Sequence, residues 1–271
     1  MLGSLLIVFR EVMEAGLIIG IVLAATQGIA GRGRWVAGGI TAGVAGAAVV
    51  AVFAGSLSAA LSGNGQDVFS AIILCIAVVM LGWHTIWMTR HGREMAGDMK
   101  ALGAEVATGQ RSLAAMAVVV AVAVLREGVE VVLFLYGIAV STHSGPVPML
   151  AGGLLGIVAG GGISWLLYRG LIVIPLHRLF AVTGLLIALL AAGMASQAAA
   201  LLAGDDIVPA LGYEMWDTSW LLSDGSMVGR AAKALMGYSD RPMGIQLLAW
   251  GVTLAVMLIA TRLVRRQPVI K

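Results

Sequence analysis

The residues best suited to chemistry in this chain form two copies of one charged motif. The pattern R-E-x-x-E occurs as Arg10-Glu11-Val12-Met13-Glu14 and again as Arg126-Glu127-Gly128-Val129-Glu130. In a helix, residues three and four positions apart lie on one face. The two glutamates of each motif therefore point the same way, and the arginine can pair with the second glutamate. Each motif predicts a pair of carboxylates held by a nearby guanidinium.

Both motifs lie inside long apolar stretches, where inserting one ionisable side chain into a membrane costs at least about 2.5–3.5 kcal/mol. Such side chains must face the protein interior or water and must find partners. If the motifs meet, four carboxylates and two guanidiniums carry a formal net charge of −2. Oxygen donors with this charge suit a hard or borderline cation. Two other interpretations stay open: ion pairs that only lock the helices together, and a proton relay.

The composition places these motifs in a membrane protein. Hydrophobic residues make up 60% of the 271 residues, charged residues make up 11%, and the mean hydropathy is +0.98. A soluble domain of this length needs a more polar surface. Helices of about 20 apolar residues can cross the hydrocarbon layer and satisfy their own backbone. We therefore predict an all-α, polytopic membrane protein with a single membrane domain over 1–271. We expect its lone cysteine, Cys75, to be a small buried hydrophobe.

Seven apolar stretches are long enough to be transmembrane helices. The predicted spans are roughly 3–27, 35–58, 67–89, 113–140, 148–168, 179–203 and 244–262. The two long connectors are 90–112, which is charged and polar, and 204–243, which is the sizeable segment expected outside the membrane.

Lysine and arginine concentrate at alternate ends of these spans. The connectors after the first, third and fifth spans, together with the C-terminal tail, hold twelve of the seventeen basic residues. The opposite ends hold only Arg230, Lys233 and Arg241. Because basic residues favour the cytoplasmic side, we expect the N-terminus outside and the C-terminus in the cytoplasm.

The chain also repeats itself. The motif of the first span recurs in the fourth, and Ala37-Gly38-Gly39 in the second span matches Ala151-Gly152-Gly153 in the fifth. The predicted units are 1–89 and 113–203, and the seventh transmembrane helix at 244–262 is extra. Because each unit has three spans, the two units would enter the membrane from opposite sides. This plan is common in secondary transporters, whose substrate site lies near the midplane where the repeats meet, and it also occurs in channels.

Two further sets of residues are weaker candidates. The extracytoplasmic segment 204–243 is rich in acids, and we select Glu214 and Asp217 as a candidate outer capture site for cations. The alternative is an interfacial anchor whose acids are only solvated. His84 lies at the cytoplasmic end of the third predicted span beside Trp83 and Trp87, and we interpret it as an interfacial histidine rather than an exit ligand.

The paired motifs, in the first and fourth of seven spans, resemble those of the oxidase-dependent iron permease family. The resemblance covers essentially the whole chain and extends to Trp216-Asp217-Thr218-Ser219-Trp220 and to Gly237-Tyr238, Pro242 and Gln246. It implies iron import through the motif residues. By position, the implied metal ligands are Glu11, Glu14, Glu127 and Glu130, and the implied supporting residues are Arg10 and Arg126.

The resemblance implies a permease of the bacterial-type cytoplasmic (inner) membrane, surrounded by lipids. Because membrane topology explains the basic ends, we expect no nucleic-acid partner. Iron, ferric or ferrous, would be the transported substrate, with no permanently bound cofactor. An extracytoplasmic ferroxidase, peroxidase or iron-binding protein would be the partner. The chain has no phosphate-binding loop motif, so we expect no ATP hydrolysis by it. The alternatives are a proton-coupled carrier for another divalent metal such as manganese, and a non-transporting anchor for a redox partner.

Overall fold

The computed structural model describes residues 1–60, 66–142, 145–170 and 176–266, and it confirms the all-α prediction for this part of the chain. The helices are α1 (Leu2–Ala25), α2 (Arg32–Ala60), α3 (Gln66–Ala107), α4 (Leu113–Thr142), α5 (Pro146–Tyr168), α6 (Leu176–Gly204), α7 (Met227–Met236) and α8 (Gly244–Arg266). All except α7 have at least 23 residues. At about 1.5 Å per residue, this length exceeds the hydrocarbon thickness of about 30 Å.

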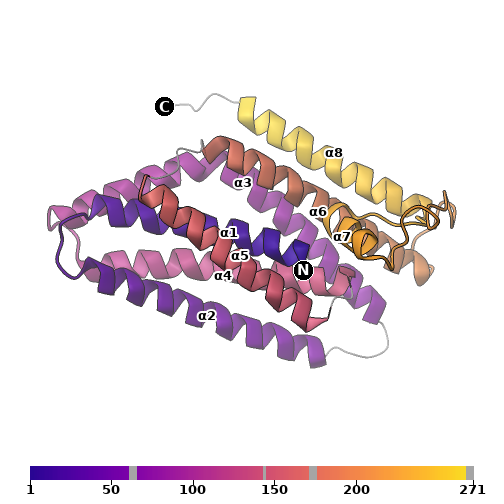
Figure 1. The fold of residues 1–271 in the computed structure, drawn as a ribbon, viewed down its shortest axis with the longest axis horizontal. Coiled ribbons are helices and arrows are strands. Elements are labelled where there is room, and N and C mark those ends of the chain that lie inside the picture. Colours follow the sequence, from indigo (N-terminus) through magenta and orange to yellow (C-terminus); the bar gives the residue numbers. More distant parts are fainter. Residues whose placement is uncertain (61–65, 143–144, 171–175, 267–271) are drawn as a thin grey trace.

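The long helices run back and forth along one direction (Figure 1). The turns joining α1 to α2 and α3 to α4 lie at one end, and the segment between α6 and α8 lies at the other. Five helices, α2, α3, α5, α6 and α8, are long and apolar enough to cross a membrane by length and composition. The remaining two long helices, α1 and α4, are the ones that contain the charged motifs. Large apolar side chains are exposed along the outer helices, among them Val52, Phe53 and Leu154, as lipid contact requires.

Helix α3 corrects the predicted connector 90–112, because it continues as a helix to Ala107. Its 42 residues correspond to about 63 Å, about twice the hydrocarbon thickness. The extension is held by packing: Leu102 and Val106 are buried, and Gly103 lies directly against Ala25 at the end of α1. No proline interrupts the sequence between the apolar part of α3 and this extension. The segment 90–107 is therefore helical rather than a loop, and its end packs against α1.

Glycines bring two pairs of helices into backbone contact. A Cβ at Gly156 of α5 would lie 2.8 Å from the carbonyl oxygen of Leu5 in α1. A Cβ at Gly43 of α2 would lie 2.7 Å from the carbonyl oxygen of Ala121 in α4. Small residues allow such close approach in membranes. Each motif helix is thus packed against the glycine-bearing second helix of the other predicted repeat.

The segment 204–243 folds into a compact unit around the short helix α7. The Ser226 side chain accepts a hydrogen bond from the amide of Gly229 and caps the start of α7. Gly237 ends α7 with φ of 68°, a conformation that favours glycine. Gly237 also packs directly on Gly193 of α6. This contact holds the segment against the bundle.

The prediction that Cys75 is buried is wrong, because its side chain is exposed. Ile72, Ile76 and Val79 of the same helix are exposed as well. Among the described residues no other helix covers this face of α3, and the hydrophobicity of cysteine suits lipid as well as it suits a protein core.

Candidate metal centre

The first motif lies buried on α1. Arg10, Glu11 and Glu14 are each at most 3% exposed. The Nε atom of Arg10 lies 2.8 Å from Oε1 of Glu14, four residues later, as the helical spacing predicts. The Nη1 atom of Arg10 lies 3.7 Å from Oε1 of Glu11. One guanidinium therefore serves both carboxylates of this motif.

The second motif lies on α4 in a more open environment. Glu127 and Glu130 are buried, and Nε of Arg126 lies 3.2 Å from Oε1 of Glu130. The Arg126 side chain is nevertheless 38% exposed. Its guanidinium lies 4.4 Å from the centre of the Trp87 ring of α3, within the range of a cation–π interaction.

His84 of α3 lies between the two motifs. Its Nε2 atom is 3.3 Å from Oε2 of Glu14 and 3.9 Å from Oε2 of Glu11. Its Nδ1 atom contacts Oε2 of Glu130. The interpretation of His84 as an interfacial histidine is wrong, because the residue is 4% exposed and faces three carboxylates. The signal in the sequence was an ionisable residue within an apolar span, the same signal that singled out the glutamates.

The structure brings the glutamates predicted as ligands to one place, and we call Glu11, Glu14, Glu127 and Glu130 the carboxylate cluster. Glu11, His84, Glu127 and Glu130 each offer one ligand atom, and these atoms all lie within 4.8 Å of one another. Glu14 lies beside them, held by Arg10 and His84.

Every member of the cluster has a buried carboxylate oxygen without a hydrogen bond from the described residues, although those of Glu14 and Glu130 lie beside Arg10 and His84. Both oxygens of Glu11 and the Oε2 atom of Glu127 are buried and unpaired in this sense. A buried carboxylate without a partner is costly, and a cation bound between such oxygens offsets the cost. The arrangement is therefore chemically suited to holding a cation, with carboxylate oxygens and one imidazole as the available donors.

The candidate outer capture residues lie far along the chain, in the segment before α7. Glu214 and Asp217 are both exposed, and both face Arg241, at 4.0 Å and 3.2 Å respectively. The hydroxyl and the amide of Ser219 donate hydrogen bonds to Oδ1 of Asp217. These bonds, with a further contribution from Arg241, lower the pKa of the Asp217 carboxyl from its ordinary value. The structure thus places the two acids together, but both lie beside the positively charged guanidinium of Arg241.

Two other acids of this segment, Asp224 and Asp240, hold the segment together. The amide of Asp224 donates to a carboxylate oxygen of Asp240, and the amide of Asp240 donates to one of Asp224. Lys233 of α7 pairs with Asp224 at 2.8 Å. These acids therefore stabilise the fold of the segment. Tyr238 contributes in the same way, since its hydroxyl donates a hydrogen bond to the carbonyl of Leu222.

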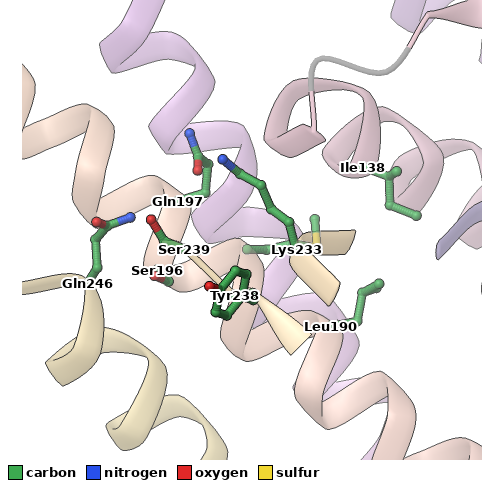
Figure 2. A pocket seen from close by; sticks show the side chains of 11 residues that line it. Ile138, Leu190, Ser196, Gln197, Lys233, Tyr238, Ser239 and Gln246 are labelled. Carbon is green, nitrogen blue, oxygen red and sulfur yellow. The ribbon is translucent and has the colours of Figure 1, made fainter. Parts of the chain in front are cut away.

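A small cavity lies between this segment and the bundle (Figure 2). It is lined by residues of α4, α6, α7, the turn after α7 and the start of α8. Figure 2 shows the polar groups of Gln197, Ser239 and Gln246 on one side and the apolar Ile138 and Leu190 on the other. Ile138 follows Glu130 by eight residues on α4, which corresponds to a rise of about 12 Å. Sequence reasoning did not identify this polar cavity.

Comparisons with known proteins connect the chain with iron permeases. The model of the Iron permease FTR1 family matches residues 1–266. The ferrous iron permease EfeU of Escherichia coli O6:H1 is 31% identical over 263 residues, which cover 94% of this chain and 93% of the relative. The ferrous iron permease EfeU of Shigella flexneri is 31% identical over 196 residues, which cover 72% of this chain and 83% of the relative. No solved structure matches the chain.

Proposed function

Because the chain belongs to the iron permease FTR1 family and is accordingly a membrane transporter rather than an enzyme, we propose that it imports iron across the cytoplasmic membrane through the carboxylate cluster of α1 and α4. The observation that carries the proposal is the convergence of buried carboxylates from two helices, with ligand atoms within 4.8 Å of one another. Iron is the transported substrate, bound in passage.

Glu11, Glu14, Glu127 and Glu130 are the proposed iron ligands. Their formal charge is only partly compensated by Arg10 and Arg126, so the cluster attracts a cation from water. A balanced set of ion pairs would be sufficient merely to lock α1 to α4. The surplus of carboxylates, together with the two oxygens of Glu11 that accept no hydrogen bond from the described residues, favours transport over a purely structural role.

The proposed path begins on the side of segment 204–243. Glu214 and Asp217 form the proposed outer capture site. An arriving cation competes there with Arg241, so binding is weak and reversible, as passage requires. The polar cavity between α6 and α7 (Figure 2) lies between this segment and α4 and supports a route toward the cluster.

We further propose seven membrane spans, formed by α1–α6 and α8, with the N-terminus outside and the C-terminus in the cytoplasm. The single domain consists of two inverted three-helix repeats, 1–89 and 113–203, and an additional helix at 244–262. The helix packing supports this repeat, because the second helix of each unit packs through glycines on the first helix of the other unit: α5 on α1, and α2 on α4. The proposed iron site lies where the repeats meet.

The proposed partners are extracytoplasmic proteins that deliver iron in a defined oxidation state. A ferroxidase, a peroxidase or an iron-binding protein would serve. The relatives are described as ferrous iron permeases, and this favours delivery of the divalent ion.

Radiolabelled iron uptake by proteoliposomes tests the proposal. The variants are Glu11→Gln and Glu127→Gln, one from each motif, which keep the side-chain volume and remove the charge. We expect each to lose most of the uptake, because the donors of both helices bind one ion. Glu105→Gln is the matched control, since Glu105 is partly exposed and pairs with Arg111 at the end of α3. Uptake by this control should equal that of the wild type.

Undiminished uptake by either motif variant, in protein shown to be folded by its thermal melting, would contradict the proposed site. Competition separates iron from manganese as substrate. An excess of Mn²⁺ that suppresses iron uptake as strongly as unlabelled iron does would favour a general divalent-metal carrier.

A further inference from the structure

We propose that His84 is a metal ligand of the carboxylate cluster, and that its nitrogen makes the site prefer divalent iron over hard cations such as Mg²⁺ and Ca²⁺. The inference rests on the proposed iron site and adds a donor from a third helix, α3, which carries neither motif.

The position of the ring supports ligation. His84 is 4% exposed, and one of its nitrogens lies within 4.8 Å of carboxylate oxygens of Glu11, Glu127 and Glu130, which also lie within this distance of one another. Ligand bonds of roughly 2.1 Å place opposite donors roughly 4.2 Å apart. Small side-chain movements would therefore bring all four donors onto one ion.

Each ring nitrogen of His84 lies beside a carboxylate, as the nitrogen opposite the metal does in metal-binding histidines. A ligating imidazole usually donates its other N–H to a carboxylate, which fixes the orientation of the ring. Nε2 of His84 faces Glu14 at 3.3 Å, and Nδ1 contacts Glu130. Whichever nitrogen binds the ion, the other has a carboxylate acceptor.

The charge of the site suits a divalent ion. Four carboxylates and two guanidiniums have a formal net charge of −2, and a neutral imidazole adds none. A divalent cation brings the sum to zero, whereas a trivalent one leaves the buried site positive, which is costly away from water. Imidazole suits iron, as it suits zinc, copper and nickel, while sites of carboxylate and water alone suit Mg²⁺, Ca²⁺ and Mn²⁺. His84 is thus the donor that distinguishes iron from the hard cations.

The first test looks for the nitrogen directly. Mn²⁺, which is paramagnetic, is bound to the full-length protein in nanodiscs, and pulsed electron paramagnetic resonance detects nitrogen coupled to it. We expect an imidazole ¹⁴N signal in the wild type that changes when histidine is labelled with ¹⁵N, a measurement that needs no substitution. The signal should vanish in His84→Gln and persist in the control His91→Gln. His91 lies on the same helix and stacks on Trp87 with its ring centre 5.0 Å away.

The second test measures selectivity. Loss of even an outer partner of a metal ligand lowers affinity by about 10–100-fold, so His84→Gln should reduce the ratio of Fe²⁺ to Ca²⁺ affinity at least about tenfold. His91→Gln should leave the ratio unchanged. An unchanged ratio in folded His84→Gln would contradict the assignment.

The failures are distinguishable. Bound Mn²⁺ without a nitrogen signal in the wild type, together with weaker binding in Glu11→Gln, would overturn the assignment of His84 and leave the carboxylate site standing. Binding that is absent, or equal in the wild type and Glu11→Gln, would overturn the carboxylate site and the assignment with it.

Discussion

Arg10 and Arg126 hold equivalent positions in the two motifs but differ in their surroundings. The Arg10 side chain is 4% exposed and lies near both carboxylates of its own motif. The Arg126 side chain is 38% exposed and lies over the ring of Trp87. The buried arginine is therefore held by both carboxylates of its motif, whereas the other is more accessible and has one carboxylate partner.

This difference predicts unequal stability effects. Arg10→Met should lower the free energy of unfolding by about 3–5 kcal/mol, because removing one partner leaves buried carboxylates without compensation. Arg126→Met should cost about 1–2 kcal/mol, since it loses a partly exposed ion pair and a cation–π contact. Thermal melting of both variants in detergent, followed by tryptophan fluorescence, measures the difference. Equal destabilisation would contradict the asymmetry.

Asp217 predicts a pH response in the outer segment. Its pKa is lowered, first by the hydrogen bonds from Ser219, so its charge contributes to stability above the unfolded-state pKa and is lost only as pH falls through the lower folded-state pKa. Ser219→Ala should raise the titration midpoint of Asp217 toward the ordinary value. The ¹³C chemical shift of the labelled carboxyl measures it.

Ser223→Ala is the control for that titration, because the Ser223 hydroxyl accepts from the amide of Gly225 rather than bonding Asp217. A midpoint that stays in place in Ser219→Ala would mean that the Ser219 hydroxyl does not lower the pKa of Asp217, and that the amide of residue 219 and Arg241 do.

At the scale of the helices, close packing through glycine decides where the motifs lie. Gly156 of α5 has no room for a side chain, because a Cβ there would lie within 2.9 Å of three atoms of α1. Gly161 of the same helix faces open space, with nothing within 4 Å. Substituting each glycine by alanine therefore separates the effect of close helix packing, present only at Gly156, from the general effect of glycine on helix stability, present at both.

Gly156→Ala should lower the free energy of unfolding by about 1–3 kcal/mol through overpacking against α1. Gly161→Ala should leave it unchanged or raise it by up to about 1 kcal/mol, since alanine favours the helix. Denaturation in mixed micelles measures both variants. A neutral Gly156→Ala would show that α1 and α5 can separate without cost, and would contradict the tight contact.

At the scale of the whole molecule, orientation decides the direction of iron movement. The segment 204–243 and the turn between α3 and α4 lie at opposite ends of the bundle (Figure 1). Our proposal places the first outside and the second in the cytoplasm. The chain has one cysteine, Cys75, so a single substitution gives a cysteine-free background.

In a Cys75→Ala background, Tyr213→Cys should react with a membrane-impermeant maleimide in intact cells. Gln110→Cys should react only after the membrane is permeabilised. Both positions are exposed, so accessibility of the side chain does not limit the reaction. The reverse pattern would contradict the proposed orientation.

Several features could be predicted from the sequence because they depend on local properties. The all-α class follows from hydropathy and from the need of backbone groups for partners in lipid, and each predicted span lies largely within one long helix of the structure. The pairing of Arg10 with Glu14 follows from helical spacing alone. The choice of four glutamates followed from the cost of placing charge among apolar residues.

Only the tertiary structure decided what surrounds those glutamates. His84 faces the carboxylate cluster because of the way α3 is rotated against α1 and α4, and the tryptophans beside it indicated an interface instead. The last turns of α3 are held by Val106 and Gly103, through contacts with parts of the chain that local sequence does not identify. Hydropathy and spacing describe one helix at a time, whereas the donors of a site between helices are selected by which faces pack together.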